Sequence, residues 1–210
     1  LLAQGAGLIL SALTAQPGSS TGPQSITANY ADNLAALPVV YGLTKVGVKY
    51  VDIRQDGNDL YIVGALCATN GQGVNAIKEI YFNDKLAVDA SGTVQSPFQY
   101  LGPGAVLVTN LAVTKYLGTD VQVADPTMQS VFGLDWGPAC VGEGVAYCVF
   151  KLTYDRASYP TGIPQITVMV EGMKCADPRL GGTFAYTQNP ALHALDYLTS
   201  KGTAATGLAR

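Results

Sequence analysis

Histidine occurs only once in the 210 residues, at His193, and it is the first candidate for acid–base chemistry. It lies within NPALHALDYLTS, where it is surrounded by apolar residues. A general base must lie within hydrogen-bond reach of the proton that it removes, and no partner for His193 can be named from the sequence. We therefore favour a packing or surface position for this side chain.

Carboxylates offer two further candidate sites, one for binding a cation and one for acid–base catalysis. Asp52, Asp56 and Asp59 crowd one predicted turn, and carboxylate oxygens are ligands of hard cations. Their spacing does not match an EF-hand loop, so a solvated turn is the favoured interpretation. Glu79 and Asp84 flank a predicted hairpin, which is not the arrangement of a glycosidase carboxylate pair.

The common catalytic motifs are absent from the sequence. It contains no G-x-S-x-G, no H-E-x-x-H and no P-loop, and GQG at 71–73 is too short to hold a phosphate. We therefore predict that the chain is not an enzyme, and we assign no catalytic, cofactor-binding or metal-binding residue.

The four cysteines, Cys67, Cys140, Cys148 and Cys175, are widely scattered and form neither a CxxC pair nor a Cys/His cluster that would hold zinc. Free thiols are favoured, because a buried cysteine behaves as a small hydrophobe. Cys140 and Cys148 flank CVGEGVAYC, so a local disulfide stays open as an alternative.

Composition limits the remaining classes of protein that the chain could belong to. Hydrophobic residues make up 48% of the chain, charged residues 13%, and the net charge is -3, which predicts a sizeable core and no sequence-specific binding of nucleic acid. The initial run LLAQGAGLILSALTAQ is shorter than the ~20 residues of a membrane span and lacks a basic flank, so we interpret it as a helix or strand buried against a neighbour. Because the chain lacks an initial Met and ends soon after a predicted helix, we expect it to be an N-terminal piece of a longer polypeptide.

Most of the elements that would position these residues are predicted strands. After a Pro/Gly/Ser linker at 17–25 come LPVVYG, KVGVKYVDI, a QDGND turn, and LYIVGALCA, an apolar run typical of a strand buried on both faces. EIYFNDKLAV predicts a hairpin with Asn83 and Asp84 at its turn. FQYL, AVLVTN and VQVA predict further strands.

The second half combines strands with two helices. ADPTMQSVFG predicts a short helix capped by Asp125, with Pro126 in its first turn. GVAYCVFKLTY alternates like a half-covered strand. Pro160 and Pro164 precede the next strand, QITVMVEG, and because proline cannot donate to a ladder, their positions fit the start of a strand or an exposed edge. NPALHALDYLTS predicts a helix with Leu192, Leu195 and Leu198 along one side.

These elements predict a strand-dominated α+β fold. We expect an apolar interface segment and linker at 1–25, a first β-rich domain at 26–124, and a second subdomain with strands and a C-terminal helix at 125–210. Most of the twelve tyrosines lie in predicted strands, where Tyr is a good β-former, and Trp136 is expected to pack in a core or interface.

Several blocks occur in an order that resembles a known family. They are LPVVYGLTKVGVKYVDI, LYIVGALC, AIKEIYFNDKLAV, GVAYCVFKLTYDRASYPTGIPQITVMVEGMKCADPR and TQNPALHALDYLT. Together they cover about residues 40–200 and resemble the tail-tip or baseplate hub proteins of long-tailed bacteriophages, typified by the tip attachment protein J of phage lambda. This chain lacks the Asp-His-Arg run that often precedes the GVAY strand in the family, and it has KVGV where Val-Gly-Gly is usual.

The resemblance implies a structural virion protein that assembles in the host cytoplasm. It would form a homotrimeric hub at the distal end of the tail, close the tail tube, contact distal tail and tail-tube proteins, and lead to the central fibre and, indirectly, the host receptor. The number of copies follows from the resemblance alone. The alternative is a receptor-binding or glycan-binding module of a tail fibre.

The same blocks nominate structural joints rather than catalytic residues. In YPTGIPQITVMVEGMKCADPR, prolines restrict the unfolded chain and fix how one strand begins. Arg179 is expected to pair with Asp177 or with a neighbouring protomer. The joints are Tyr41, Gly42, Ile163, Pro164, Asp177, Pro178, Arg179, Asn189 and Pro190.

Overall fold

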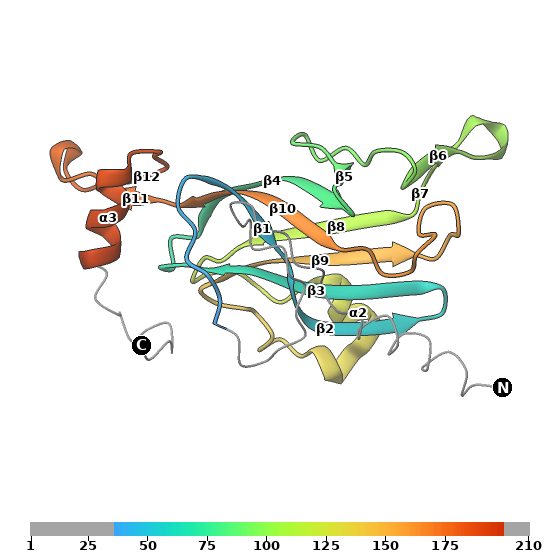
Figure 1. Cartoon of the computed structure of the whole chain (residues 1–210). Coiled ribbons are helices and arrows are strands. Elements are labelled where there is room, and N and C mark those ends of the chain that lie inside the picture. Colours follow the sequence, from blue (N-terminus) through green and yellow to red (C-terminus); the bar gives the residue numbers. More distant parts are fainter. Residues whose placement is uncertain (1–35, 200–210) are drawn as a thin grey trace.

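Two four-stranded antiparallel sheets lie face to face in the computed structural model, which describes residues 36–199 (Figure 1). The first sheet has the order β1 (Leu43–Gly47), β10 (Ile166–Met173), β4 (Val74–Phe82) and β5 (Lys85–Val88). The second has the order β2 (Lys49–Asp56), β3 (Asp59–Ala68), β9 (Val145–Thr153) and β8 (Leu111–Leu117).

Two small sheets and five short helical segments complete the described fold. The small sheets pair β6 (Gln99–Leu101) with β7 (Leu107–Thr109), and β11 (Cys175–Ala176) with β12 (Phe184–Ala185). The α-helices are α2 (Pro126–Phe132) and α3 (Pro190–Thr199), and the 3₁₀ segments are η1 (Pro103–Ala105), η2 (Gly133–Trp136) and η3 (Pro178–Leu180). The strand-dominated α+β class is therefore confirmed.

The connection from β1 to β2 joins the two main sheets. Only Val48 separates β1 from β2, and this residue is fully buried while its N–H donates to the carbonyl of Ile166. The neighbouring Gly64 of β3 leaves room for the Val48 side chain, because a Cβ at that position would collide with it. The chain thus passes from one sheet to the other without a loop.

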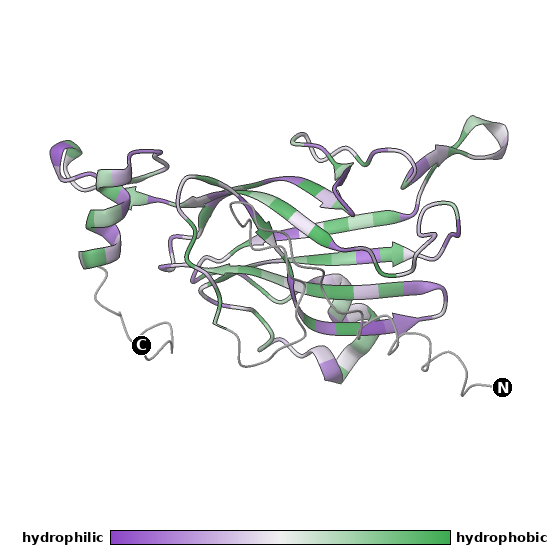
Figure 2. Ribbon diagram, viewed as in Figure 1, coloured by the Kyte–Doolittle hydropathy of each residue, from purple (hydrophilic) through white to green (hydrophobic). Residues whose placement is uncertain are grey.

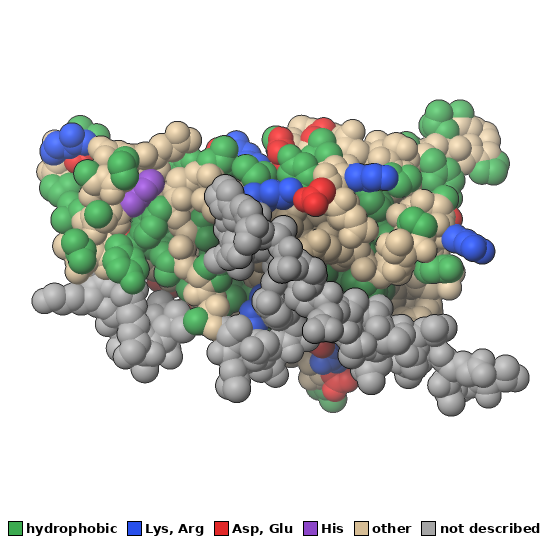
Figure 3. All heavy atoms as spheres, viewed as in Figure 1, with side chains coloured by type: hydrophobic (Ala, Val, Ile, Leu, Met, Phe, Trp, Pro, Cys, Tyr) green, Lys and Arg blue, Asp and Glu red, His purple; other side chains and the backbone are tan. Residues whose placement is uncertain are grey.

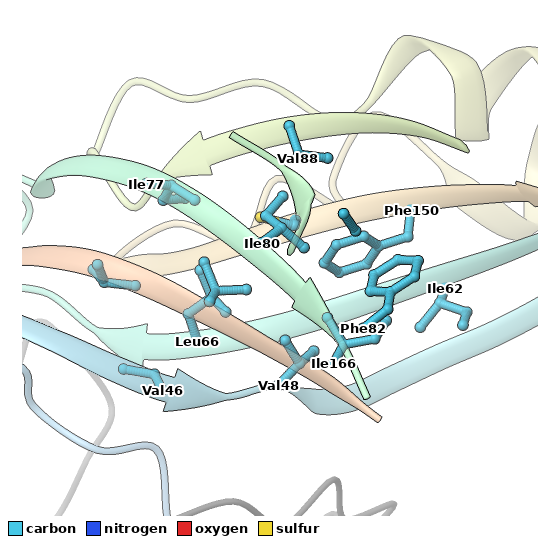
Figure 4. Packing of buried hydrophobic residues seen from close by; sticks show 14 of the residues in the cluster. Val46, Val48, Ile62, Leu66, Ile77, Ile80, Phe82, Val88, Phe150 and Ile166 are labelled. Atoms are coloured by element: carbon cyan, nitrogen blue, oxygen red, sulfur yellow. The ribbon is translucent and has the colours of Figure 1, made fainter. Parts of the chain in front are cut away.

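The core fills the space between the sheets (Figure 4). Phe82 of β4 packs edge-on against Phe98 and Phe150, with ring centroids 5.1 and 6.2 Å apart. Ile166, Val168 and Val170 alternate inward along β10, as their spacing predicts for one face of a strand. Aliphatic side chains from both sheets complete this layer, among them Val46, Ile62, Leu66, Ile77 and Ile80.

A second apolar cluster covers the outer face of the β2–β3–β9–β8 sheet. Met128 of α2 and Trp136 of η2 lie against Tyr61, Tyr147 and Val149, so both faces of β9 are buried. The expectation that β9 is half-covered is wrong, because the segment after β8 folds back over this face. The packing position expected for Trp136 is confirmed.

Several local predictions hold. Asn83 and Asp84 form the β4–β5 turn with φ values of 49° and 63°, and the Asp125 carboxylate accepts a hydrogen bond from Met128 N–H at the start of α2. All four cysteines are free thiols, and burial raises the pKa of Cys67 and Cys148 to about 12.

Other local predictions fail. VQVA is not a strand, and Val121 is 86% exposed, whereas the real strand, β8, was not predicted. LPVVYG is not a strand either, since within it only Val39 pairs, in an isolated bridge with Ala68. β10 lies inside its sheet, so Pro164 marks the start of a strand and not an exposed edge.

The expected boundary between domains at 124/125 does not separate the two main sheets. In each sheet, strands from before and after this boundary pair: β10 pairs with β1 and β4, and β9 pairs with β3 and β8.

The apolar run at 1–16 and the linker at 17–25 lie outside the described residues. Within the described part of the chain, no helix has the length and apolarity needed to cross a membrane.

Candidate interaction surfaces

An uncharged hairpin, β6–β7, projects from one end of the molecule (Figures 1 and 2). Residues 99–109 read QYLGPGAVLVT, and Leu101 faces Leu107 across the ladder. Their side chains are 71% and 58% exposed, and Tyr100 and Val106 are also exposed. Large apolar side chains clustered at an exposed site are characteristic of interaction surfaces.

The tip of the hairpin has a defined conformation. Gly102 N–H donates to the carbonyl of Val106 at 2.8 Å, and Ala105 N–H donates back to the carbonyl of Gly102 at 3.2 Å. Gly104 adopts φ 75°, which glycine allows without steric cost. The apolar side chains are therefore presented on an ordered turn.

Buried polar groups hold the base of the hairpin. Asn110 follows β7, is 5% exposed, and donates through its side-chain amide to Ser158 Oγ at 3.1 Å. Tyr159 Oη donates to the Asn110 carbonyl at 2.7 Å, and Ser158 Oγ lies 2.8 Å from the carbonyl oxygen of Pro97. These contacts tie both ends of the hairpin to the loop between β9 and β10.

That loop contains two of the nominated joints, Ile163 and Pro164. Ile163 packs against the main core, and the Pro164 carbonyl accepts a hydrogen bond from buried Tyr50 Oη at 2.9 Å. Near the start of the loop, the carboxylate of Asp155 accepts from the side chain and backbone N–H of Ser158, and these bonds lower the pKa of Asp155. One loop thus positions both the hairpin base and the start of β10.

A small C-terminal unit, formed by β11, η3, β12 and α3, lies at the opposite end of the molecule (Figure 1). Asp177 caps η3 by accepting from Arg179 N–H at 3.0 Å, and its carboxylate also binds the Arg179 guanidinium at 2.7 Å. Pro178 occupies the first turn of η3. Of the two partners expected for Arg179, the structure places Asp177 against it.

The remaining joints attach α3 to the body. The Tyr41 ring stacks on His193 with centroids 5.1 Å apart, and Tyr41 Oη donates to Asp196 Oδ2 at 2.7 Å. Gly42 adopts φ +61° next to the His193 ring. Asn189 accepts from Ala191 N–H at the start of the helix, directly before Pro190.

The three leucines expected along one side of α3 differ in burial. His193 and Asp196 are half-buried together with Leu192, whereas Leu195 and Leu198 are exposed. His193 was expected in a packing or surface position, and the structure places its half-buried ring against Tyr41. Leu180 and Phe184 of the C-terminal unit are also exposed, and hydrophobic side chains gather around the histidine in Figure 3.

A surface pocket of about 300 Å³ lies beside the β9–β10 loop. Tyr154, which is 63% exposed, lines it together with Gln55, Asn58 and Asp59. Burial alone raises the pKa of Asp59, but hydrogen bonds from Lys151 and Thr153 outweigh this effect and lower the pKa overall.

The acidic turn does not gather its carboxylates around one point. Asp52 pairs with Arg54 at 2.7 Å, and Asp59 pairs with Lys151 at 2.8 Å. Among residues 36–199, no three His, Cys, Asp or Glu side chains lie together in a way that could hold a metal ion.

Sequence reasoning missed the hairpin as a surface. FQYL and AVLVTN were predicted as ordinary strands, and they are strands, but they pair only with each other, outside the main sheets. The signal was present in the eleven consecutive uncharged residues around a Gly-Pro-Gly turn.

Comparisons with known proteins show a similarity of fold to a solved structure. No family model matches the chain, and no curated protein matches it. Among solved structures, the chain is similar to part of a chain in the virion of a native gene transfer agent particle, with a TM-score of 0.54 and 16% identity. The match covers 95% of this chain but only 45% of that one.

Proposed function

We propose that this chain is a structural virion protein of a phage-type particle, and that it forms a trimeric hub at the distal end of a tail. The hub closes the tail tube, contacts distal tail and tail-tube proteins, and joins the tube to the central fibre used for host attachment and DNA delivery. The observation that supports a virion protein is the fold shared, over 95% of the chain, with part of a chain in a gene transfer agent virion. The hub assignment rests on the sequence blocks that resemble tail-tip proteins.

Two further features support a structural role. The nominated joints make contacts that fix the chain: Pro164 accepts from Tyr50, Asp177 binds Arg179, and Tyr41 holds α3. Exposed apolar side chains gather at both ends of the molecule, and assembly with other copies or proteins would remove them from water. The blocks that resemble tail-tip proteins form strands of both main sheets and most of the C-terminal unit.

Electron microscopy of intact particles, labelled with an antibody against residues 40–200, tests the proposal. We expect label only at the distal end of the tail, with density that sharpens under three-fold averaging. Label on the capsid or along the tube would contradict the hub assignment.

A glycan-binding or receptor-binding module is the second candidate, and the pocket beside Tyr154 is the observation that favours it. An exposed aromatic ring next to Gln55 and Asn58 offers a stacking surface and amide groups, a combination that suits a sugar ring. Binding of the isolated chain to host envelope fractions, abolished by Tyr154→Ala, would support this candidate.

We also propose that the chain acts without catalysis. Incubation with purified murein tests this point, because a tail-associated hydrolase would release soluble fragments. Release that a point substitution at a carboxylate abolishes would overturn it.

A further inference from the structure

We propose that a pocket between β5 and β8 binds a small branched aliphatic carboxylate, whose negative charge pairs with the Lys115 ammonium. The pocket has a volume of about 350 Å³ and lies between β8 and the segment formed by β5 and the turn after it (Figure 1). This volume falls at the lower end of the range of small-molecule sites. The inference concerns a site that the proposed function does not use, and it does not rest on that function.

Lys115 lines this pocket and is a half-buried cation held by neutral groups. Its amine donates to the carbonyls of Ile77 and Lys78 at 2.9 and 3.0 Å, which leaves one of the three ammonium protons for a further partner. Within residues 36–199, no carboxylate lies within ion-pair distance of Lys115, whereas Lys45 and Lys151 each pair with an aspartate. An anionic ligand would supply the missing counter-ion.

Asp89 interacts with Lys115 only at longer range, because its carboxylate is used within its own turn. One carboxylate oxygen accepts from Ser91 N–H, Ser91 Oγ and Thr93 N–H at 2.6–2.9 Å, and the other accepts from the Gln95 side chain at 3.0 Å. These bonds hold the acidic group in the turn. They leave the ammonium accessible to a carboxylate from outside the chain.

Cys148 is the other titratable group that interacts with Lys115. Burial raises the pKa of the Cys148 thiol to about 12, so it stays neutral and provides no counter-ion near neutral pH. Burial also lowers the pKa of Lys115, and this effect outweighs the opposite influence of Cys148 and Asp89. A bound anion would act in the other direction and favour the ammonium form.

The remaining wall of the pocket is mostly apolar. Val88 and Val94, which bridge each other, line one side, and Val113 of β8 lines the other. Gly92 adds no side chain, and a Cβ there would meet no atom within 4 Å. Aliphatic walls around one cation suit a short branched chain that ends in a carboxylate, whereas a sugar or a nucleotide needs more polar partners.

Isovalerate, added to the 210-residue chain and followed by NMR, tests the site with a simple ligand of this class. We expect saturable shifts confined to residues 88–94 and 113–115, with a dissociation constant of about 1–10 mM. Isovaleramide has the same shape without the charge and should bind at least ~10-fold more weakly. Equal binding of the acid and the amide would contradict recognition by a cation.

A pair of variants locates the charge that the ligand uses. Lys115→Met should weaken isovalerate binding at least ~10-fold, whereas Lys85→Met, at an exposed position of β5, should leave it unchanged. Because Lys115→Met also removes two hydrogen bonds, its unfolding midpoint is measured first. The comparison of acid with amide uses the wild-type chain, so it decides the matter even if this variant does not fold.

The titration of Lys115 supplies a reading that a purely structural role would not move. Saturating isovalerate should raise the pKa of Lys115 by about one unit for each tenfold preference of the ligand for the charged amine. Affinity should correspondingly fall as the pH rises through the pKa of Lys115. Isovaleramide should leave the titration unchanged.

A branched carboxylate has two sources, a free short-chain acid and the C-terminus of a polypeptide that ends in Val or Leu. N-acetyl-leucine separates them, because tighter binding than isovalerate indicates a polypeptide C-terminus and exclusion indicates a free acid. Unsaturable shifts spread over the surface lysines, or no shifts at about 50 mM isovalerate, would overturn the proposal. The antibody label on intact particles tests the hub proposal separately, so failure of one leaves the other standing.

Discussion

The ring of His193 stacks on the ring of Tyr41 with an interplanar angle of 22°, and this pair joins helix α3 to a segment 152 residues earlier in the chain. One turn later on the helix, Asp196 accepts a 2.7 Å hydrogen bond from the same tyrosine. A single aromatic side chain therefore attaches the C-terminal unit through both its ring and its hydroxyl. No residue of α3 is fully buried, which makes this attachment important for the helix.

Tyr41→Phe should loosen α3 while leaving the two main sheets intact. The change removes the hydrogen bond to Asp196 but keeps the ring on His193, and such a bond contributes about 1–2 kcal/mol. We expect hydrogen exchange in 190–199 to accelerate by roughly 5–30-fold, with the rates in β3 and β9 unchanged. Tyr154→Phe, at an exposed ring, is the control, and uniform acceleration throughout the protein would contradict a local attachment.

Gly172→Ala should destabilise the protein severely. A Cβ at this position in β10 would collide with the Val40 carbonyl, a backbone group that cannot rotate away, and Gly172 N–H also donates to the Gly42 carbonyl at 2.7 Å. We expect a loss of about 3 kcal/mol or more in the free energy of unfolding measured with urea. Gly137→Ala is the matched control, because its Cβ would meet no atom within 4 Å and its φ of -74° suits alanine.

Lys115→Met should weaken the side of the fold where β8 approaches β4. The Lys115 amine donates to the carbonyls of Ile77 and Lys78 at 2.9 and 3.0 Å, and burial lowers the pKa of Lys115. Methionine keeps the length but leaves both acceptors without this donor, at a cost of about 1–3 kcal/mol in the free energy of unfolding. Lys85→Met, on an exposed position of β5, should cost much less, and equal losses would count against the bridge.

Stability should fall in alkali, and Tyr159 should contribute to the fall. Burial raises the pKa of Tyr159, so below about pH 10 its phenol is neutral in both folded and unfolded states and the full stability is present. At higher pH the unfolded state releases the proton first, and stability decreases by about 1.4 kcal/mol per pH unit for this group.

The Tyr159→Phe variant should therefore be less stable near neutral pH, because it lacks the hydrogen bond to Asn110, yet lose stability less steeply above about pH 10. Urea unfolding across this range measures both effects. A slope identical to that of the wild type would show that Tyr159 titrates normally in the folded protein.

Local rules predicted the parts of the candidate surfaces that depend on short-range chemistry. Arg179 pairs with Asp177 and a helix begins at Pro190, because both features depend on residues within a few positions of one another. The hairpin strands were also predicted, since FQYL and AVLVTN favour extended chain. Their isolation from the main sheets was not, because pairing partners depend on residues such as Asn110 and Tyr159, which lie 49 positions apart.

The sequence by itself determined the strand-dominated class, the Asn83–Asp84 turn and the inward face of β10, because each follows from alternation or from a backbone preference within a few residues. Only the tertiary structure decided that α2 and η2 cover the outer face of β9, that α3 turns His193 inward and its leucines outward, and that apolar side chains gather at opposite ends. These features depend on which distant surfaces meet, and hydrophobic burial is non-directional, so the pattern of apolar residues specifies that they are buried without specifying against what.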